Sequence, residues 1–392
     1  MDCKIEIKDN LVYVDISGSI TSQNALDFEN VISSYPGDNN GVIIDTKNLS
    51  FISSAGLRVI LSTKKRCKNK TFKIVNANKS IMDIFRVTGF DEIMDIEPAP
   101  RHIDVTGCKI IGRGACGECY RLDDETIIKL YYSKVSKEEI NKEKDLAKKA
   151  FVMGVPTAIS YDIVESEGRI GVVYELLNCK TLVELIREDT ENSNLEEYVK
   201  MYVNVCKQVH SIDAGEEDIP SFKDLNRADI PNVTGITDEE REYLYKFLDM
   251  VPNRTTCIHG DLNPNNIMVQ NGEGCLIDMG EFSTGMNLFD ISRIMFSFVF
   301  SPDRTVEIND FYKLPHTTVD KIWHLFIKYY FGVETLEEVK TLSPDNEWLE
   351  PLAWFRCVTS MLKFNRWPEA KRNFALGLLR EKLIPFIKSK SE

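Results

Sequence analysis

The chain has 392 residues, which is long enough for two or three domains that each bury their own core. Its hydrophobic content of 43% and charged content of 28% are ordinary for a globular protein. The formal net charge of −13 disfavours nonspecific binding to nucleic acid or to an anionic membrane surface.

Targeting signals and cysteine spacing limit the setting of the protein. The first ten residues, "MDCKIEIKDN", contain no basic or apolar stretch and predict no signal peptide. The most apolar run, "LFDISRIMFSFVF", carries Asp290 and Arg293 and is too short to span a bilayer. Ten cysteines are scattered along the chain, with one Cys-x-x-Cys pair at Cys116 and Cys119. No second pair has metal-ligand spacing, so reduced thiols in a cytoplasmic protein are favoured over a zinc site.

Residues 1–97 are expected to form a small α/β domain. Apolar and polar residues alternate over 5–16, with "DN" at a turn between two strands, and short apolar runs at 41–45 and 72–75 predict two more strands. Helices are expected around 25–32, 53–65 and 80–88. The second begins with a serine suited to capping and ends in lysines, and the third ends at Gly89. This alternation implies a sheet with helices on one side.

A composition change after the first domain marks a boundary. The prolines and the acid of "EPAP", residues 97–100, predict a linker over 98–105. The second unit is expected to be strand-rich over 106–178 and helical over 179–392. Thr237 followed by Glu240 is the pattern of a capping box and predicts a helix start there.

A glycine-rich stretch opens the second unit. "IIGRGACGECYRL" places Gly112, Gly114 and Gly117 in the pattern G-x-G-x-x-G, which in dinucleotide-binding folds precedes a helix. Here the strand-like run "ETIIKLYY" follows and carries Lys129. A glycine-rich hairpin followed by a strand lysine fits a lid over ATP phosphates, with the lysine reaching the phosphate oxygens. The alternative is a plain hairpin with a solvated lysine.

A buried lysine needs a carboxylate partner if it is to stay charged and in place. The charged helical segment "EEINKEKDLAKKA" follows Lys129 and offers two candidates. We expect Glu143 to be the partner, with Glu139 as the competing candidate.

The polar stretch "HGDLNPNNI" points to phosphoryl transfer. Asp261 and Asn266 have the D-x-x-x-x-N spacing of a phosphotransfer catalytic loop, and Asp278 follows in "CLIDMG" at a strand end. Oxygen ligands suit magnesium, so Asn266 and Asp278 are the predicted metal ligands, together with substrate phosphates. Asp261 would then accept the proton of an attacking hydroxyl group.

These residues resemble the aminoglycoside and choline phosphotransferase branch of the protein-kinase-like enzymes. The resemblance covers residues 106–300 and rests on "HGDLNPNN" and on "IDMGEFSTGMNLFDIS", in which Asp290 matches a helix-capping aspartate. It implies an α+β bilobal fold with ATP between the lobes. The adenine would contact the backbone of "YELL", around Glu175 and Leu177. The Cys-x-x-Cys pair within the lid departs from the family, either as a sensor of oxidation or as small residues tolerated there.

The first unit resembles a STAS domain, the α/β fold of anti-sigma factor antagonists. The match lies in "DTKNLSFISSAGLRVIL", where Ser54 takes the place of the family's phosphorylatable serine. A phosphate there would lie at a helix N-terminus, although Ser54 would otherwise only cap its helix. Ser53 replaces the family's usual aspartate, and "GSIT" stands where acidic residues are common. Both departures weaken a partner-switching role.

The sequence therefore predicts an ATP- and Mg²⁺-dependent phosphotransferase that acts on a hydroxyl group. The family resemblance implies a small-molecule acceptor, and the STAS domain is expected to be a regulatory domain that interacts with a protein partner. One alternative is a protein serine kinase that acts on Ser54 or on a partner's STAS serine. Another is a non-catalytic module that senses nucleotide. The set of Lys129, Asp261, Asn266 and Asp278 argues against the last alternative.

Overall fold

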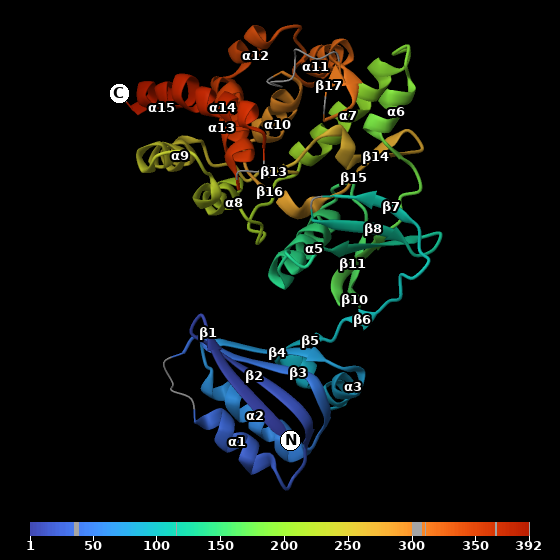
Figure 1. The fold of residues 1–392 in the computed structure, drawn as a ribbon, viewed down its shortest axis with the longest axis vertical. Coiled ribbons are helices and arrows are strands. Elements are labelled where there is room, and N and C mark those ends of the chain that lie inside the picture. Colours follow the sequence, from blue (N-terminus) through green and yellow to red (C-terminus); the bar gives the residue numbers. More distant parts are fainter. Residues whose placement is uncertain (35–38, 115, 300–307, 310, 365–366, 392) are drawn as a thin grey trace. The chain divides into compact units, whose positions relative to one another are not determined.

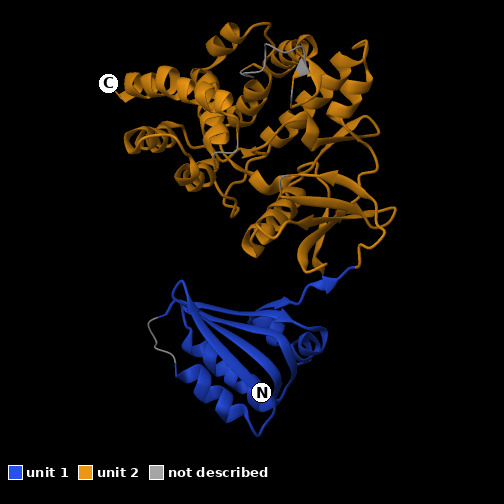
Figure 2. Cartoon of the chain, viewed as in Figure 1, with its two compact units in different colours: residues 1–103 blue, residues 104–392 orange. Residues whose placement is uncertain are grey.

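The chain folds into two compact units in the computed structural model, Met1–Ile103 and Asp104–Glu392 (Figure 2). The structure describes all residues except 35–38, 115, 300–307, 310, 365–366 and 392. The division falls within the segment predicted as a linker, 98–105, but this segment is not free of regular structure. Strand β5 extends to Pro98, and a two-residue strand, β6, follows at Arg101–His102.

The first unit is built on a five-stranded sheet with the order β1-β2-β3-β4-β5 (Figure 1). Strands β1 and β2 are antiparallel, and the remaining neighbours are parallel. The strands are β1 (Asp2–Lys8), β2 (Leu11–Ile20), β3 (Gly41–Ile52), β4 (Thr71–Ala77) and β5 (Asp95–Pro98). The helices are α1 (Ala25–Ser33), α2 (Ser54–Arg66), α3 (Lys79–Val87) and α4 (Phe90–Ile93).

Helix α2 shows why this unit folds as the sequence pattern predicts. The side chain of Ser53 accepts a hydrogen bond from the backbone N–H of Gly56 at 3.3 Å and caps the helix. Leu57 and Ile60 lie on its buried face, so the amphipathic pattern is satisfied against the sheet. Lysine and arginine residues occupy the last turn, where they complement the helix dipole.

The second unit begins with an antiparallel sheet in which the strands β10, β11, β9, β8 and β7 lie in that order. These strands are β7 (Ile110–Arg113), β8 (Gly117–Arg121), β9 (Thr126–Tyr131), β10 (Ser160–Ser166) and β11 (Arg169–Glu175). Helix α5 (Lys137–Val152) packs against β10, β11 and the 3₁₀ turn η3 (Met279–Glu281). The sheet and α5 share a small core cluster that contains Tyr131, Ile140 and Val172.

The rest of the second unit is mainly helical, with short strands between the helices (Figure 1). The helices are α6 (Leu182–Glu188), α7 (Leu195–His210), α8 (Phe222–Asp229), α9 (Asp238–Met250), α10 (Leu288–Phe298), α11 (His316–Phe331), α12 (Leu336–Leu342), α13 (Leu349–Leu362), α14 (Glu369–Leu378) and α15 (Ile384–Ser391). The short strands are β12 (Lys180–Thr181), β13 (Cys257–Ile258), β14 (Ile267–Gln270), β15 (Glu273–Leu276), β16 (Ser283–Thr284), β17 (Ile308–Asn309) and β18 (Leu314–Pro315).

Helix α9 confirms the predicted capping box. Thr237 accepts a hydrogen bond from the backbone N–H of Glu240, and the Glu240 carboxylate accepts one from the backbone N–H of Thr237. Among the described residues, no helix has the length and apolar character needed to cross a membrane.

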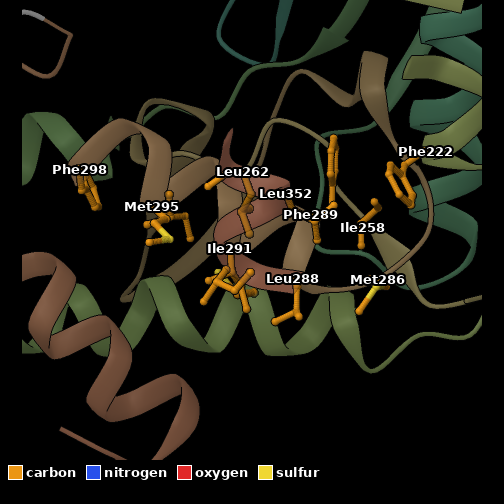
Figure 3. Close-up of a cluster of buried hydrophobic side chains, with 14 of the residues drawn as sticks. Phe222, Ile258, Leu262, Met286, Leu288, Phe289, Ile291, Met295, Phe298 and Leu352 are labelled. Carbon is orange, nitrogen blue, oxygen red and sulfur yellow. The ribbon is translucent and has the colours of Figure 1, made fainter. Parts of the chain in front are cut away.

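A large apolar core lies beneath the loop that contains "HGDLNPNNI". Figure 3 shows part of it, including Leu262 of that loop, Ile291 of α10 and Leu352 of α13, which belong to one core cluster. All three side chains are completely or almost completely buried. The polar loop is therefore anchored by an apolar residue within it, which fixes where the neighbouring carboxylate and amides stand.

Candidate active site

The backbone of residues 259–267, the predicted catalytic loop, is held by one buried carboxylate. The Asp290 side chain is fully buried and accepts hydrogen bonds from the backbone N–H groups of His259 and Gly260, both at 2.8 Å. It also contacts His210 Nε2 at 3.1 Å. The helix-capping role expected for Asp290 is wrong, because Asn287 is the N-cap residue of α10 and Asp290 lies in the first turn. Its oxygens satisfy backbone donors of the loop instead.

The buried side chain of His259 ties the loop to the strand end that follows it. Its Nδ1 accepts a hydrogen bond from the backbone N–H of Asp261 at 3.2 Å, so its Nε2 carries the proton. That Nε2 lies 3.1 Å from the carbonyl oxygen of Ile277. The two segments that carry Asp261 and Asp278 are thereby joined through the His259 imidazole.

Asp261 is surrounded by donors and cations. Its Oδ1 accepts a hydrogen bond from Arg293 Nε at 2.6 Å, and its Oδ2 accepts one from Asn266 Nδ2 at 3.2 Å. Arg356 Nη2 lies 3.9 Å from Oδ1. Burial raises the pKa of Asp261, but the charges of Arg293 and Arg356 outweigh burial and hold that pKa below its ordinary value. The carboxylate is therefore ionised and oriented.

The two predicted metal ligands lie on neighbouring segments. The side-chain amide nitrogen of Asn266 donates to the backbone carbonyl oxygen of Asp261 at 2.9 Å. The backbone carbonyl oxygen of Asn266 accepts a hydrogen bond from the backbone N–H of Ile277 at 3.0 Å. Asp278 follows directly in a left-handed conformation with φ of 64°. Its side chain is 53% exposed, so its carboxylate is accessible from solvent.

Lys129 on β9 joins the sheet to this site. Its Nζ lies 2.6 Å from Glu143 Oε1 on α5 and 3.2 Å from Asp278 Oδ1. Glu139, the competing candidate, instead forms a capping box with Ser136 at the start of α5. Burial lowers the pKa of Lys129, but Asp278 and Glu143 raise it above its ordinary value. The lysine is charged and is not solvated as in a plain hairpin.

The glycine-rich stretch forms the predicted hairpin between β7 and β8, closed by a 2.9 Å hydrogen bond from Gly114 N–H to the Gly117 carbonyl. Glycine is required sterically at position 117, because a Cβ there would lie 2.3 Å from the carbonyl oxygen of Leu130. A Cβ at Gly112 or Gly114 would meet no atom closer than 3.8 Å. These two glycines are therefore not required by packing within the chain.

The end of β11 and the segment that follows it contain the residues expected at the adenine. Glu175 forms two hydrogen bonds with the backbone of Ile159. Its backbone N–H donates to the Ile159 carbonyl oxygen at 2.9 Å, and its side-chain Oε2 accepts from the Ile159 N–H at 3.2 Å. The carbonyl of the buried Leu177 accepts from the N–H of Cys179 at 2.8 Å. This stretch is a firmly held connection between the sheet and the helical region.

The Cys-x-x-Cys pair lies at the start of β8. Cys116 is exposed, whereas Cys119 is partly buried and pairs in register with Gly112 and Lys129. Burial raises the pKa of the Cys119 thiol. Both thiols are free.

Ser54 is exposed and is the first residue of α2. The alternative in which Ser54 caps this helix is wrong, because the neighbouring Ser53 supplies the capping oxygen. The hydroxyl group of Ser54 is therefore not used for capping.

Two arginines at Asp261 were not predicted as site residues. Arg293 belongs to the apolar run of α10 and Arg356 to the apolar helix α13, and both side chains are largely buried. A charged residue inside an apolar helical run needs a buried partner, which is the sequence signal that could have identified them. Arg356 Nη2 donates to the Gly260 carbonyl and lies 3.4 Å from Glu281 Oε2.

Two family models match the chain. A model of the STAS domain matches residues 2–103, and a model of the phosphotransferase enzyme family matches residues 108–316. The second match spans more than half of the chain, so the chain belongs to the phosphotransferase enzyme family and carries an N-terminal STAS domain. These matches confirm the predicted family resemblance and the predicted fold class, an α/β STAS domain followed by a protein-kinase-like α+β fold.

Solved structures with similar folds share little sequence with this chain. A thermostable mutant of the aminoglycoside phosphotransferase APH(4)-Ia is 14% identical, with 72% of this chain and 94% of that chain covered and a TM-score of 0.48. The amicoumacin kinase hAmiN is 13% identical, with 76% and 94% covered and a TM-score of 0.47. A choline/ethanolamine kinase family protein from Mesorhizobium loti is 12% identical, with 70% and 92% covered and a TM-score of 0.39. No curated protein matches the chain.

Proposed function

We propose that the chain is an ATP- and Mg²⁺-dependent phosphotransferase that transfers the γ-phosphoryl group to a hydroxyl group of a small-molecule acceptor. Membership of the phosphotransferase enzyme family supports the reaction class. The observation that carries the proposal is the convergence of the predicted site residues. Lys129 contacts Asp278 at 3.2 Å, and Asn266 contacts Asp261 at 3.2 Å. The N–H of Ile277, next to Asp278, donates to the Asn266 carbonyl.

The residues present fit a magnesium ion held together with phosphates. Asp278 offers a half-exposed carboxylate, and Asn266 uses its amide nitrogen toward Asp261, which leaves the amide oxygen as its ligand atom. Two protein oxygens supplemented by phosphate oxygens and water are a usual magnesium environment in phosphotransferases. When bound, the ion would offset the negative charge of the phosphates.

Lys129 and the glycine-rich hairpin fit the rest of a nucleotide. Lys129 is charged and fixed by Glu143 at 2.6 Å, so it can bind phosphate oxygens without a large rearrangement. Gly112 and Gly114 have space that packing does not use, as is needed where a backbone approaches phosphates closely. We place the adenine against the backbone of Glu175 and Leu177.

The proposed phosphoryl transfer needs one group that accepts the proton of the acceptor hydroxyl. The acceptor oxygen bonds to the γ-phosphorus, the bond from that phosphorus to the β,γ-bridging oxygen breaks, and ADP leaves. The hydroxyl proton passes to Asp261. Because Arg293 and Arg356 lower the pKa of Asp261, this carboxylate mainly orients the hydroxyl group and takes the proton late, as the phosphoryl group arrives.

The test is ATP consumption with Mg²⁺ across small alcohols, aminoglycosides and the protein's own STAS domain. We expect acceptor-dependent ADP formation in the wild type and its loss in Asp261→Asn. The matched control is Asp345→Asn, which removes an exposed carboxylate paired with Arg254 at 2.6 Å. If no acceptor stimulates ADP formation and nucleotide still binds, the chain is the non-catalytic nucleotide-sensing module instead.

A second candidate function is a protein serine kinase that phosphorylates a STAS serine. It is favoured by Ser54, which is exposed at the first position of α2, where backbone N–H groups favour a phosphate. Incubation with labelled ATP and Mg²⁺ should then label the STAS domain, and the label should disappear in both Ser54→Ala and Asp261→Asn. An unmodified Ser54 after prolonged incubation would eliminate this candidate and leave the STAS domain as a docking domain for a protein partner.

The ten free cysteines bear on where the protein works. Free thiols persist in a reducing compartment, which supports a cytoplasmic location.

A further inference from the structure

Arg293 is a buried cation in the middle of an apolar helix. It lies on α10, and only 14% of its side chain is exposed. Its neighbours Ile294 and Met295 belong to the main core. A guanidinium group in such surroundings is costly unless its donors are paired, so its contacts should explain its presence.

The contacts of Arg293 point to the catalytic loop. Its Nε donates to Asp261 Oδ1 at 2.6 Å, and its Nη1 donates to the hydroxyl of Ser297, one turn further along α10. Its guanidinium carbon lies 5.3 Å from the ring centre of Phe311 and 5.6 Å from that of Phe296. Two aromatic rings and two hydrogen bonds hold the planar group in one orientation.

The carboxylate of Asp261 is consequently fixed at both oxygens. Arg293 holds Oδ1, and Asn266 Nδ2 contacts Oδ2 at 3.2 Å, so rotation of the carboxylate would break a contact on either side. Arg356 does not make the first contact, because its Nη2 is bonded to the Gly260 carbonyl and lies 3.9 Å from Oδ1. Arg293 is thus the cation that sets the direction of Oδ1.

One helix therefore controls both parts of the loop. Asp290 of α10 binds the backbone N–H groups of His259 and Gly260, and Arg293, almost one helical turn later, binds the side chain of Asp261. The backbone is already anchored without Arg293. What Arg293 adds is the orientation of the reacting carboxylate.

We propose that Arg293 is a positioning residue for phosphoryl transfer, which holds the Asp261 carboxylate in the orientation that receives the acceptor hydroxyl group. This inference rests on the proposed function and deepens it. Small misplacements of a reacting group cost a large part of the rate, whereas nucleotide binding on Lys129 and Asp278 does not involve Asp261. The loss of Arg293 should therefore lower kcat and leave the KM for ATP almost unchanged.

The experiment compares Arg293→Met, which keeps the length without the charge, with Arg293→Lys, which keeps the charge. The assay is Mg²⁺-dependent ATP hydrolysis with water as the acceptor. For Arg293→Met we expect kcat to fall about 10- to 100-fold, with KM for ATP within about 2-fold of wild type. Arg293→Lys should recover part of kcat. The control, Arg254→Met, removes an exposed arginine paired with Asp345 and should behave as wild type.

A readout independent of activity separates this proposal from the proposed function. The ¹³Cγ NMR signal of Asp261, assigned by its loss in Asp261→Asn, should shift and broaden in Arg293→Met because the carboxylate gains rotational freedom. Absence of ATP turnover in the wild type would reject the proposed function, and the NMR comparison would still decide the positioning role. If Arg293→Met does not fold, Arg293→Lys carries the comparison, with a partial fall in kcat and a shifted signal expected. An unchanged Asp261 signal with unchanged kcat in the folded variant would overturn the proposal.

Discussion

The glycine-rich hairpin and the catalytic-loop segment face the same proposed nucleotide but are built in opposite ways. In the catalytic loop, Leu262 is buried in the largest core and the backbone is bonded to Asp290. In the hairpin, a Cβ added at Gly112 or Gly114 would meet no atom of the described residues closer than 3.8 Å. A lid must change shape when a ligand enters, whereas a catalytic carboxylate must keep its orientation. The difference is therefore consistent with the roles that we propose for the hairpin and for the catalytic loop.

The largest effect on turnover should come from a substitution in the catalytic loop. Asp261→Asn keeps the shape of the side chain but removes the proton acceptor, and turnover should fall by a factor on the order of 10² or more. ATP binding should persist, because no contact of Asp261 involves Lys129 or Asp278. Steady-state kinetics with calorimetry of ATP binding measure both quantities. Wild-type turnover in this variant would remove Asp261 from the mechanism.

The carboxylate of Asp278 should control the Mg²⁺-dependent binding of ATP. Asp278→Ala deletes the charged ligand proposed for Mg²⁺, and we expect Mg²⁺-supported ATP binding to be abolished in calorimetry. The same titration without Mg²⁺ is the control, since Lys129 keeps its 2.6 Å contact with Glu143. Unchanged affinity with Mg²⁺ would mean that the ion is held elsewhere.

The anchor of the catalytic loop should matter for stability as well as for rate. Asp290→Ala leaves the buried N–H groups of His259 and Gly260 without their acceptor and should destabilise the second unit by about 2–5 kcal/mol. Urea unfolding followed by tryptophan fluorescence measures the change. Asp345→Ala, at an exposed ion pair, is the matched control and should shift the midpoint little.

The same anchor predicts the direction of a pH effect. Burial raises the pKa of Asp290, but its hydrogen bond and charge interaction with His210 outweigh burial, so the pKa lies below its ordinary value of 3.8. The stabilisation is therefore fully present above that ordinary value and is lost as the pH falls below it toward the folded-state pKa. Acid unfolding of wild type and Asp290→Asn should differ in this range, and identical acid midpoints would contradict the prediction.

The hairpin gives a smaller and internally controlled effect. Gly117→Ala places a Cβ against the Leu130 carbonyl and should destabilise the sheet by about 1–3 kcal/mol, whereas Gly112→Ala should cost less than about 0.5 kcal/mol. If Gly112 serves the nucleotide, its variant should instead raise the KM for ATP. Equal stability losses in the two variants would show that the lid is packed as tightly as the strand behind it.

The smallest effect concerns the STAS unit, where two adjacent serines are predicted to differ. Ser53→Ala removes the cap of α2 and should cost about 1 kcal/mol, whereas Ser54→Ala should change stability by only a few tenths. Hydrogen exchange of the α2 amides in the full chain reports this locally. Faster exchange in Ser54→Ala than in Ser53→Ala would reverse the assignment of the cap.

The sequence predicted those features that depend on neighbours along the chain. The Thr237–Glu240 capping box and the hairpin of "IIGRGACGECYRL" depend on short spacings, and the structure contains both. The linker was predicted less well, since strands extend to Pro98 and resume at 101–102. Proline tolerates an edge strand, so composition alone did not exclude regular structure there.

The contacts at Asp261 show what only the tertiary structure decided. The two domain types and the candidate site residues could be predicted from the sequence, because these predictions use local spacing and residue type. The sequence did not determine that Arg293 and Arg356, from two helices distant in sequence, meet at that carboxylate, or that Asp290 binds a loop rather than its own helix. Such contacts depend on which helix faces are buried against one another, and a buried charge reveals its partner only when the packing brings the two together.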